Sequence, residues 1–170
     1  MDKLGCALLS FIILSMTTEV RSQVLNCGLQ FPLLNEIEWG MDLDQVRGAL
    51  EKQGRSVKVI DTVIVLSASS FGAEATTKVW FGGHSRKLWF IETKFNEPTK
   101  AIRDSLVDYF SKLLGKPHQH TTNEQKTLFL TLNVEVVKWK TKASVLAVTI
   151  AWRGRNILNA GLLVHRVGAF

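Results

Sequence analysis

Residues 75–95, ATTKVWFGGHSRKLWFIETKF, have the pattern of two strands joined by a tight turn. Apolar runs with strand character lie on both sides of residues 82–85; in the second run large apolar side chains fall on both faces near the turn, so we expect that strand to be covered on both sides there. The Gly-Gly pair at the start of this turn can take the positive φ values that tight hairpin turns require. We therefore predict an antiparallel hairpin at this position.

A second stretch repeats this pattern. Residues 136–152, VVKWKTKASVLAVTIAW, again give a tryptophan-bearing strand, a polar turn and a longer apolar strand. The repeat divides the chain into one unit at about residues 29–95 and another at about 96–170. Short turns force consecutive strands to pair antiparallel. We predict an α+β fold in which residues 23–170 form one compact domain of two tandem helix-plus-strands units, with the helices packed on one face of the sheet.

Each predicted unit begins with a helix. Asp42 is a good N-cap, Gln45 completes a capping box, and Gly54 supplies a left-handed stop. The buried stripe of this first helix consists of Leu43, Val46 and Leu50. The second helix is predicted from about Pro98, placed in its first turn, to Leu114. Its stripe consists of Ile102, Leu106, Tyr109, Phe110 and Leu113.

Further strands are predicted from apolar runs outside the first hairpin. They cover residues 56–68, 126–133, 135–142, 144–152 and 156–167. The segment between the second helix and residue 126 is polar, and we predict it to be a loop.

The first 22 residues have the features of an export signal. A charged start is followed by an apolar run of about a dozen residues, shorter than the ~20 that span a bilayer. We place cleavage after Ser22 and expect an exported protein, periplasmic or secreted; an uncleaved membrane anchor is the alternative. Cys27 is then the only cysteine, so no internal disulfide forms. Three interpretations of Cys27 are open: a buried side chain, a free or intermolecularly bridged thiol, or a lipid anchor. Lipidation requires a small residue before the cysteine, whereas Asn26 stands there.

Three stretches carry a family resemblance: WGMDLDQVRGAL (39–50), FGAEATTKVWFGGHSRKLWFIETKF (71–95) and LLGKP (113–117). Together they resemble the SmpA/OmlA (BamE) and β-lactamase-inhibitor-protein-like superfamily of exported proteins. The resemblance covers roughly residues 37–166 and includes no active-site motif. It implies binding or envelope assembly through protein contacts, and no functional residue can be transferred from it.

Few residues indicate chemistry. His118 and His120 are candidate metal ligands with Glu124 as a third, but zinc needs four ligands, or three and water. A solvated loop is the alternative. No nucleophile motif, metalloprotease motif or phosphate loop occurs. We therefore predict no enzyme activity and no cofactor, and keep a small metal-dependent hydrolase as an alternative.

A basic stretch, VKWKTK, is the clearest candidate surface. On a strand Lys138, Lys140 and Lys142 share one face, and their mutual repulsion is tolerated only in water or against an anionic partner. A solvated face that discourages edge aggregation is the alternative. Arg153 and Arg155 in the following turn would extend this surface.

The net charge of +6 in 170 residues agrees with an anionic partner, but no nucleic-acid motif is present. Our first hypothesis is an exported, non-enzymatic binding module that meets another envelope or secreted protein on the open face of its sheet. The second is a peripheral membrane-surface protein that binds anionic lipid through its basic strand face. At least one of the five tryptophans is expected to be solvent-accessible.

Overall fold

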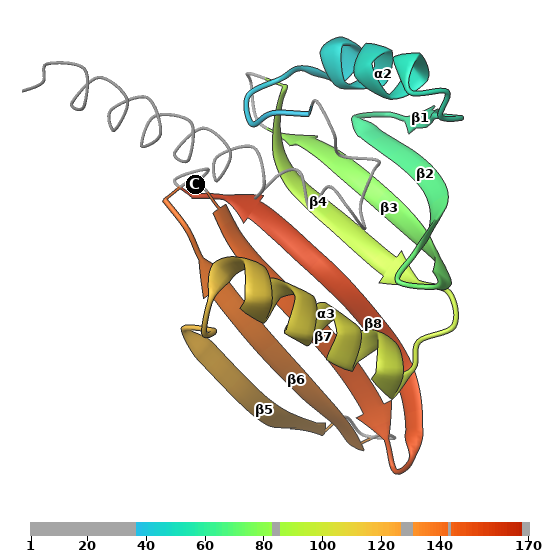
Figure 1. The fold of residues 1–170 in the computed structure, drawn as a ribbon. Coiled ribbons are helices and arrows are strands. Elements are labelled where there is room, and N and C mark those ends of the chain that lie inside the picture. The colour runs from blue at the N-terminus through green and yellow to red at the C-terminus, as the bar shows by residue number, and fades with distance from the viewer. Residues whose placement is uncertain (1–36, 83–85, 127–130, 143, 168–170) are drawn as a thin grey trace, which may run out of the picture.

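The computed structural model describes residues 37–82, 86–126, 131–142 and 144–167. These residues form two helices and one eight-stranded antiparallel sheet, which confirms the α+β class (Figure 1). The elements are α2 (Leu43–Lys52), β1 (Lys58–Ile60), β2 (Val63–Ser70), β3 (Ala73–Gly82), β4 (Lys87–Phe95), α3 (Lys100–Leu114), β5 (Gln119–Lys126), β6 (Thr131–Lys140), β7 (Ser144–Arg153) and β8 (Asn156–Arg166). The proposed signal at 1–22 and Cys27 lie outside the described residues.

Helix α2 has the predicted caps. The Asp42 carboxylate accepts a hydrogen bond from the Gln45 backbone N–H, and the Gln45 side chain accepts one from the Asp42 N–H, both at 2.9 Å. Gly54 follows the helix with φ of +72°, so it ends the helix as predicted. Val46 and Leu50 are fully buried. Sequence rules for caps succeed here because every interaction is local.

Helix α3 begins two residues later than predicted. Thr99 is its N-cap, since its hydroxyl accepts a hydrogen bond from the Ile102 N–H at 3.2 Å. The placement of Pro98 in the first turn was therefore wrong: Pro98 precedes the cap, because the Thr99 side chain satisfies an N–H that would otherwise lack a partner. The predicted end at Leu114 is correct, and Gly115 follows with φ of +82°.

Three predictions about the strands were also wrong. Residues 56–68 form two strands rather than one, because the chain reverses after β1 and Asp61 takes a positive φ of 52°. The polar segment predicted to be a loop contains β5, which pairs with β6 over its full length. Residues 131–140 form the single strand β6 where two strands had been predicted.

The sheet consists of two sets of four consecutive strands joined side by side. Strands β1 to β4 follow one another, strands β5 to β8 do the same, and β4 pairs antiparallel with β8 to join them. Gly161 of β8 lies at this junction, where a Cβ atom would come within 2.7 Å of the Thr93 carbonyl oxygen of β4. Glycine thus allows the close approach of these two backbones.

A continuous row of buried side chains crosses six strands. Residues paired directly across antiparallel strands share a face. The row consists of Ile64, Val79, Ile91, Val164, Leu146 and Trp139. Each is at most 3% exposed, and all belong to one core that also contains buried residues of both helices.

Polar groups of two tryptophans fix this core. Trp139 donates its indole N–H to the Gly115 carbonyl oxygen at 3.0 Å, which ties the end of α3 to β6. Figure 1 shows α3 crossing β6, β7 and β8. Trp39, before α2, donates to the buried Ser144 hydroxyl at 2.8 Å. The segment that precedes the first helix is thereby attached to β7.

Candidate functional site: a basic sheet face

The strand positions between the core positions form a second face of the sheet. Strand pairing arranges its side chains in three parallel rows. The first row consists of Ile60, Val63, Trp80, Phe90, His165, Val145 and Lys140. The second consists of Lys58, Val65, Lys78, Glu92, Leu163, Ala147, Lys138 and Gln119. The third consists of Ser67, Thr76, Lys94, Gly161, Thr149, Val136 and Thr121.

We call these three rows the basic face. Its cations are Lys58, Lys78, Lys94, Lys138 and Lys140, of which only Lys138 is half-buried while the others are exposed. The only carboxylate in the same rows is that of Glu92. The face therefore has a net positive charge, with lysines contributed by β1, β3, β4 and β6.

The first row is a mostly apolar stripe beside these lysines, with His165 between Phe90 and Val145 and Lys140 at its end. Val63, Trp80, Phe90 and Val145 are half-buried, and Ile60 at its end is 47% exposed. The stripe broadens next to Phe90, because the ring of Trp89 lies 5.4 Å from it and also covers Gly82. Large side chains with part of their surface in water are what protein interfaces use as anchors.

The structure brings together only part of the surface predicted from VKWKTK. Lys138 and Lys140 lie on the basic face, but Lys142 follows the end of β6. Arg153 ends β7 and Arg155 follows it, whereas Lys140 pairs with Val145 near the beginning of that strand. At about 3.4 Å per residue, the arginines are about 27 Å from this lysine. They do not extend the basic face.

The sequence missed Lys58, Lys78 and Lys94. Alternation within each strand gives the relative direction of neighbouring side chains, but only pairing shows that these three share a face with Lys138. No single strand shows the excess of positive charge, because Glu74 shares a face of β3 with Lys78 and Glu92 shares a face of β4 with Lys94.

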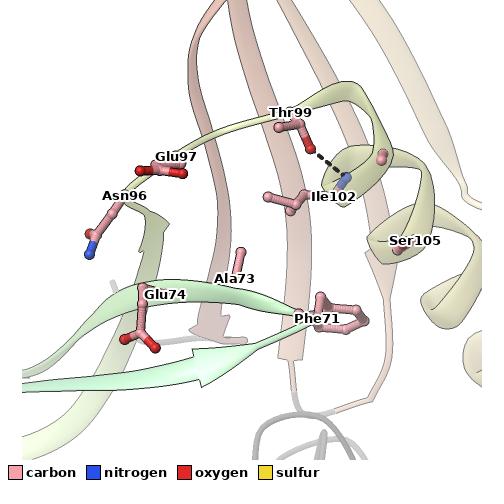
Figure 2. A pocket seen from close by; sticks show the side chains of 10 residues that line it. Phe71, Ala73, Glu74, Asn96, Glu97, Thr99, Ile102 and Ser105 are labelled. Carbon is pink, nitrogen blue, oxygen red and sulfur yellow. Dashed lines mark hydrogen bonds between the residues drawn. The ribbon is translucent and has the colours of Figure 1, made fainter.

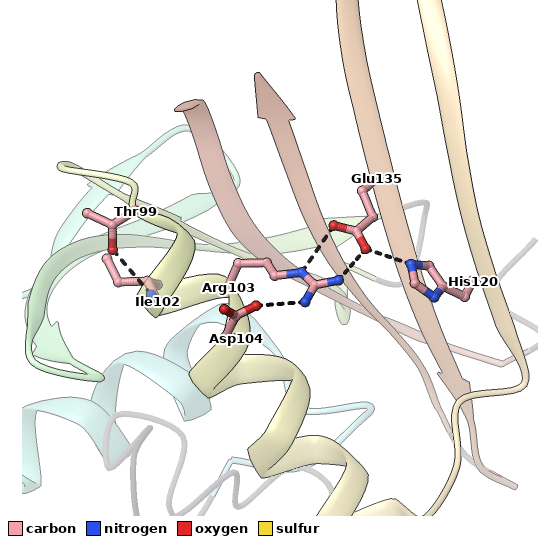
Figure 3. Close-up of polar contacts among 6 residues, drawn as sticks. All are labelled: Thr99, Ile102, Arg103, Asp104, His120 and Glu135. Carbon is pink, nitrogen blue, oxygen red and sulfur yellow. Dashed lines mark hydrogen bonds and ion pairs between the residues drawn. The ribbon is translucent and has the colours of Figure 1, made fainter. Parts of the chain in front are cut away.

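Of the two histidine candidates, His120 belongs to a different cluster, centred on Glu135 of β6 (Figure 3). The Glu135 carboxylate accepts hydrogen bonds from Nε and Nη2 along one edge of the Arg103 guanidinium, the Nε contact being 3.1 Å. The same carboxylate lies 2.6 Å from Nε2 of His120, and Arg103 also contacts Asp104 at 2.7 Å. This cluster joins α3 to β6 and to the edge strand β5.

The contacts between Arg103 and Glu135 favour the charged forms of these two side chains. Burial alone would raise the pKa of Glu135, but hydrogen bonds from Arg103 and His120 outweigh it and hold that pKa below its ordinary value of 4.5. Burial alone would lower the pKa of Arg103, yet hydrogen bonds to Glu135 and Asp104 raise it. The Arg103–Glu135 ion pair thus attaches α3 to the sheet.

The part of the chain that the structure describes contains no group of side chains that could bind a metal ion together. No group of three His, Cys, Asp or Glu side chains is close enough there to hold an ion. His120 and Glu124 are four residues apart on β5, about 13 Å along an extended strand, so the proposed third ligand is distant from the first. His118 lies just before β5, where its N–H donates to the Lys138 carbonyl oxygen.

A cavity of about 640 Å³ lies between the β2–β3 turn and the beginning of α3 (Figure 2). Phe71 at this turn stacks edge-on against Tyr109 at 5.6 Å, so its ring belongs to the core. The backbone N–H of Ile102 is already used by the Thr99 cap. Glu74 and Glu97 line the opening together with Thr99 and Ser105. The Phe71 ring and the Thr99 cap thus have structural roles at this cavity.

Two further observations bear on the function. Within the described ranges, neither helix has the length and apolar character needed to cross a membrane. None of the family models, curated proteins or solved structures compared with the chain matches it.

Proposed function

We propose that the chain is an exported, non-enzymatic binding module whose basic face contacts another envelope or secreted protein. The observation that carries this proposal is the half-buried apolar stripe running beside lysines on one sheet face. Apolar area at the centre and charges beside it are the usual composition of a non-obligate protein interface. The resemblance to exported binding and envelope-assembly proteins supports the same function.

The proposal includes an architecture. The two helices, each leading its own set of strands, act as braces on the same face of the sheet and leave the basic face to the partner. Support comes from the core, in which Val46 of α2 and Leu106 of α3 share one cluster with the row that includes Val79. The Arg103–Glu135 pair adds a polar attachment on that side.

A lysine footprint tests the proposal without altering the protein. The full chain is treated with a lysine-acetylating reagent, alone and with solubilised envelope from its own cell, and each lysine's rate is measured by mass spectrometry. We expect slower acetylation of Lys78, Lys138 and Lys140 in the presence of the partner. Lys52 and Lys100 on the helices serve as controls and should not change. Equal rates everywhere, or protection confined to the helices, would refute the proposal.

The non-enzymatic part has its own test. Robust turnover in a broad hydrolase screen, abolished by a single substitution, would refute it. The cavity beside Phe71 and the His120 cluster are the places to substitute first, since they hold the polar groups outside the basic face.

A second candidate is attachment to an anionic membrane surface, favoured by the excess of lysine on one face. Geometry argues against it. Neighbouring strands rotate by roughly 20–25°. The lysines extend from β1 to β6 across six strand-to-strand steps, so their ends differ in direction by roughly 120–150°. A planar lipid surface would reach only part of such a face.

A further inference from the structure

The lysines of the basic face form no ion pair in the described part of the chain, although Glu92 lies directly across from Lys78 in the strand register. Among the described residues, none of the five lies within 4.0 Å of a carboxylate. The ion pairs found involve Arg47, Lys87, Arg103, Lys112, Lys126 and His120. What sets the basic face apart is that its five unpaired lysines share three adjacent rows of one sheet face with a single carboxylate, that of Glu92.

The apolar stripe and the lysines are in reach of one ligand. Adjacent rows are two residues apart along each strand, or about 7 Å. Lys78 and Lys138 therefore lie one row away from Trp80 and Val145, and Lys140 ends the stripe itself. From β1 to β6 the stripe crosses six strand spacings, about 29 Å in all.

We infer that the basic face binds an acidic amphipathic polypeptide segment, with apolar side chains on the stripe and carboxylates on the lysines. This inference rests on the proposed function and names the chemistry of the partner. A helix of about 20 residues matches the length of the stripe. Such a segment can follow the twist of the sheet, which a bilayer surface cannot do. Charge complementarity selects the acidic segment and accelerates its association.

Binding is tested with two synthetic 20-residue peptides. One has leucine and glutamate at helical spacing, and the other has glutamine in place of every glutamate. Affinity for the full chain is measured by calorimetry at 50 and 500 mM salt. We expect the Glu peptide to bind at least tenfold more tightly than the Gln peptide at low salt. This advantage should fall at high salt, because exposed charges are screened within about 3–10 Å.

Two matched variants locate the site. The face variant carries Lys78→Gln, Lys138→Gln and Lys140→Gln. The control variant carries three substitutions at exposed lysines outside the face: Lys52→Gln, Lys100→Gln and Lys116→Gln. Both lose the same charge, and circular dichroism checks that both fold. Each exposed lysine–carboxylate pair contributes about 1.5- to 5-fold. We expect the face variant to lose about tenfold in affinity for the Glu peptide, and the control less than twofold.

Each other outcome overturns the inference. Equal losses in both variants would mean a general charge effect, and no binding of the Glu peptide would remove the proposed chemistry. Binding to vesicles of phosphatidylcholine and phosphatidylglycerol, weakened in the face variant while the Glu peptide does not bind, would identify lipid as the ligand instead. Equal affinities for the two peptides would refute an acidic partner but would not affect the proposed function. The proposed function is tested separately by the lysine footprint.

Discussion

Gly161 is the residue whose replacement should most directly loosen the sheet. It lies where β4 pairs with β8, the strand pairing that joins the two sets of consecutive strands in the described sheet. In Gly161→Ala the new Cβ would lie 2.7 Å from the Thr93 carbonyl oxygen. That oxygen belongs to the backbone of a paired strand, so relief requires the two strands to separate. Overpacking of this kind costs about 1–3 kcal/mol.

Urea unfolding monitored by tryptophan fluorescence measures this cost. With a slope of about 1.5 kcal/mol per molar urea, a loss of 2 kcal/mol lowers the midpoint by about 1.3 M. Gly48→Ala is the matched control, because Gly48 lies inside α2 and its Cβ would meet no atom within 4 Å. Alanine is favoured over glycine in a helix by about 0.5–1 kcal/mol, so this midpoint should rise.

The two glycines therefore predict shifts of opposite sign for the same chemical change. An unchanged or higher midpoint for Gly161→Ala would refute the close approach of β4 and β8. A lower midpoint for Gly48→Ala would show instead that any added methyl group destabilises the chain.

Three further predictions concern stability. Folding lowers the pKa of Glu135, so the stability that its carboxylate contributes is fully present above the ordinary value of 4.5 and is lost as pH falls through the lower folded pKa. Urea titrations should therefore show that the difference in unfolding free energy between the protein and Glu135→Gln narrows over that pH range. Asp42→Ala removes the cap that binds the Gln45 N–H and should cost about 1 kcal/mol by thermal unfolding. Trp139→Phe loses the hydrogen bond to Gly115 and leaves a void, and should lower the free energy of unfolding in urea by about 1–3 kcal/mol.

Local signals in the sequence were sufficient for the helices. The Asp42 and Gln45 cap and the stop at Gly54 depend on neighbours within a few residues, and the structure contains them all. Strand β5 could not be found in this way. Its sequence, QHTTNEQK, has no apolar alternation because nearly all of its side chains are exposed. It is a strand because β6 offers it a pairing edge, and that partner is a tertiary feature.

Register also escapes the sequence. Alternation alone puts Leu88 and Ile91 of β4 on opposite faces, yet both are buried in the same core. Trp80 pairs with Phe90, but the next residue, Phe81, pairs with Leu88, so Trp89 is an extra residue in β4. A bulge of one residue reverses every face assignment on one side of it. The strand could be predicted from the sequence, but the bulge within it could not.

The same one-residue rule explains why the site was only half predicted. The internal repeat aligns the tryptophan-bearing strands by Trp80 and Trp139, as though they were equivalent. In the sheet Trp80 is on the basic face, and Trp139 is in the core row together with Val79.

The two strands are therefore out of phase by one residue relative to that alignment. Lys78 is two residues before its tryptophan and shares its face, whereas Lys138 is directly before Trp139 and points the opposite way. The phase difference brings Lys78 and Lys138 into the same row. Two lysines that the repeat places at unrelated positions thus become neighbours on one surface. The charge of the basic face is a product of register, which is why it must be tested by substitutions chosen from strand pairing.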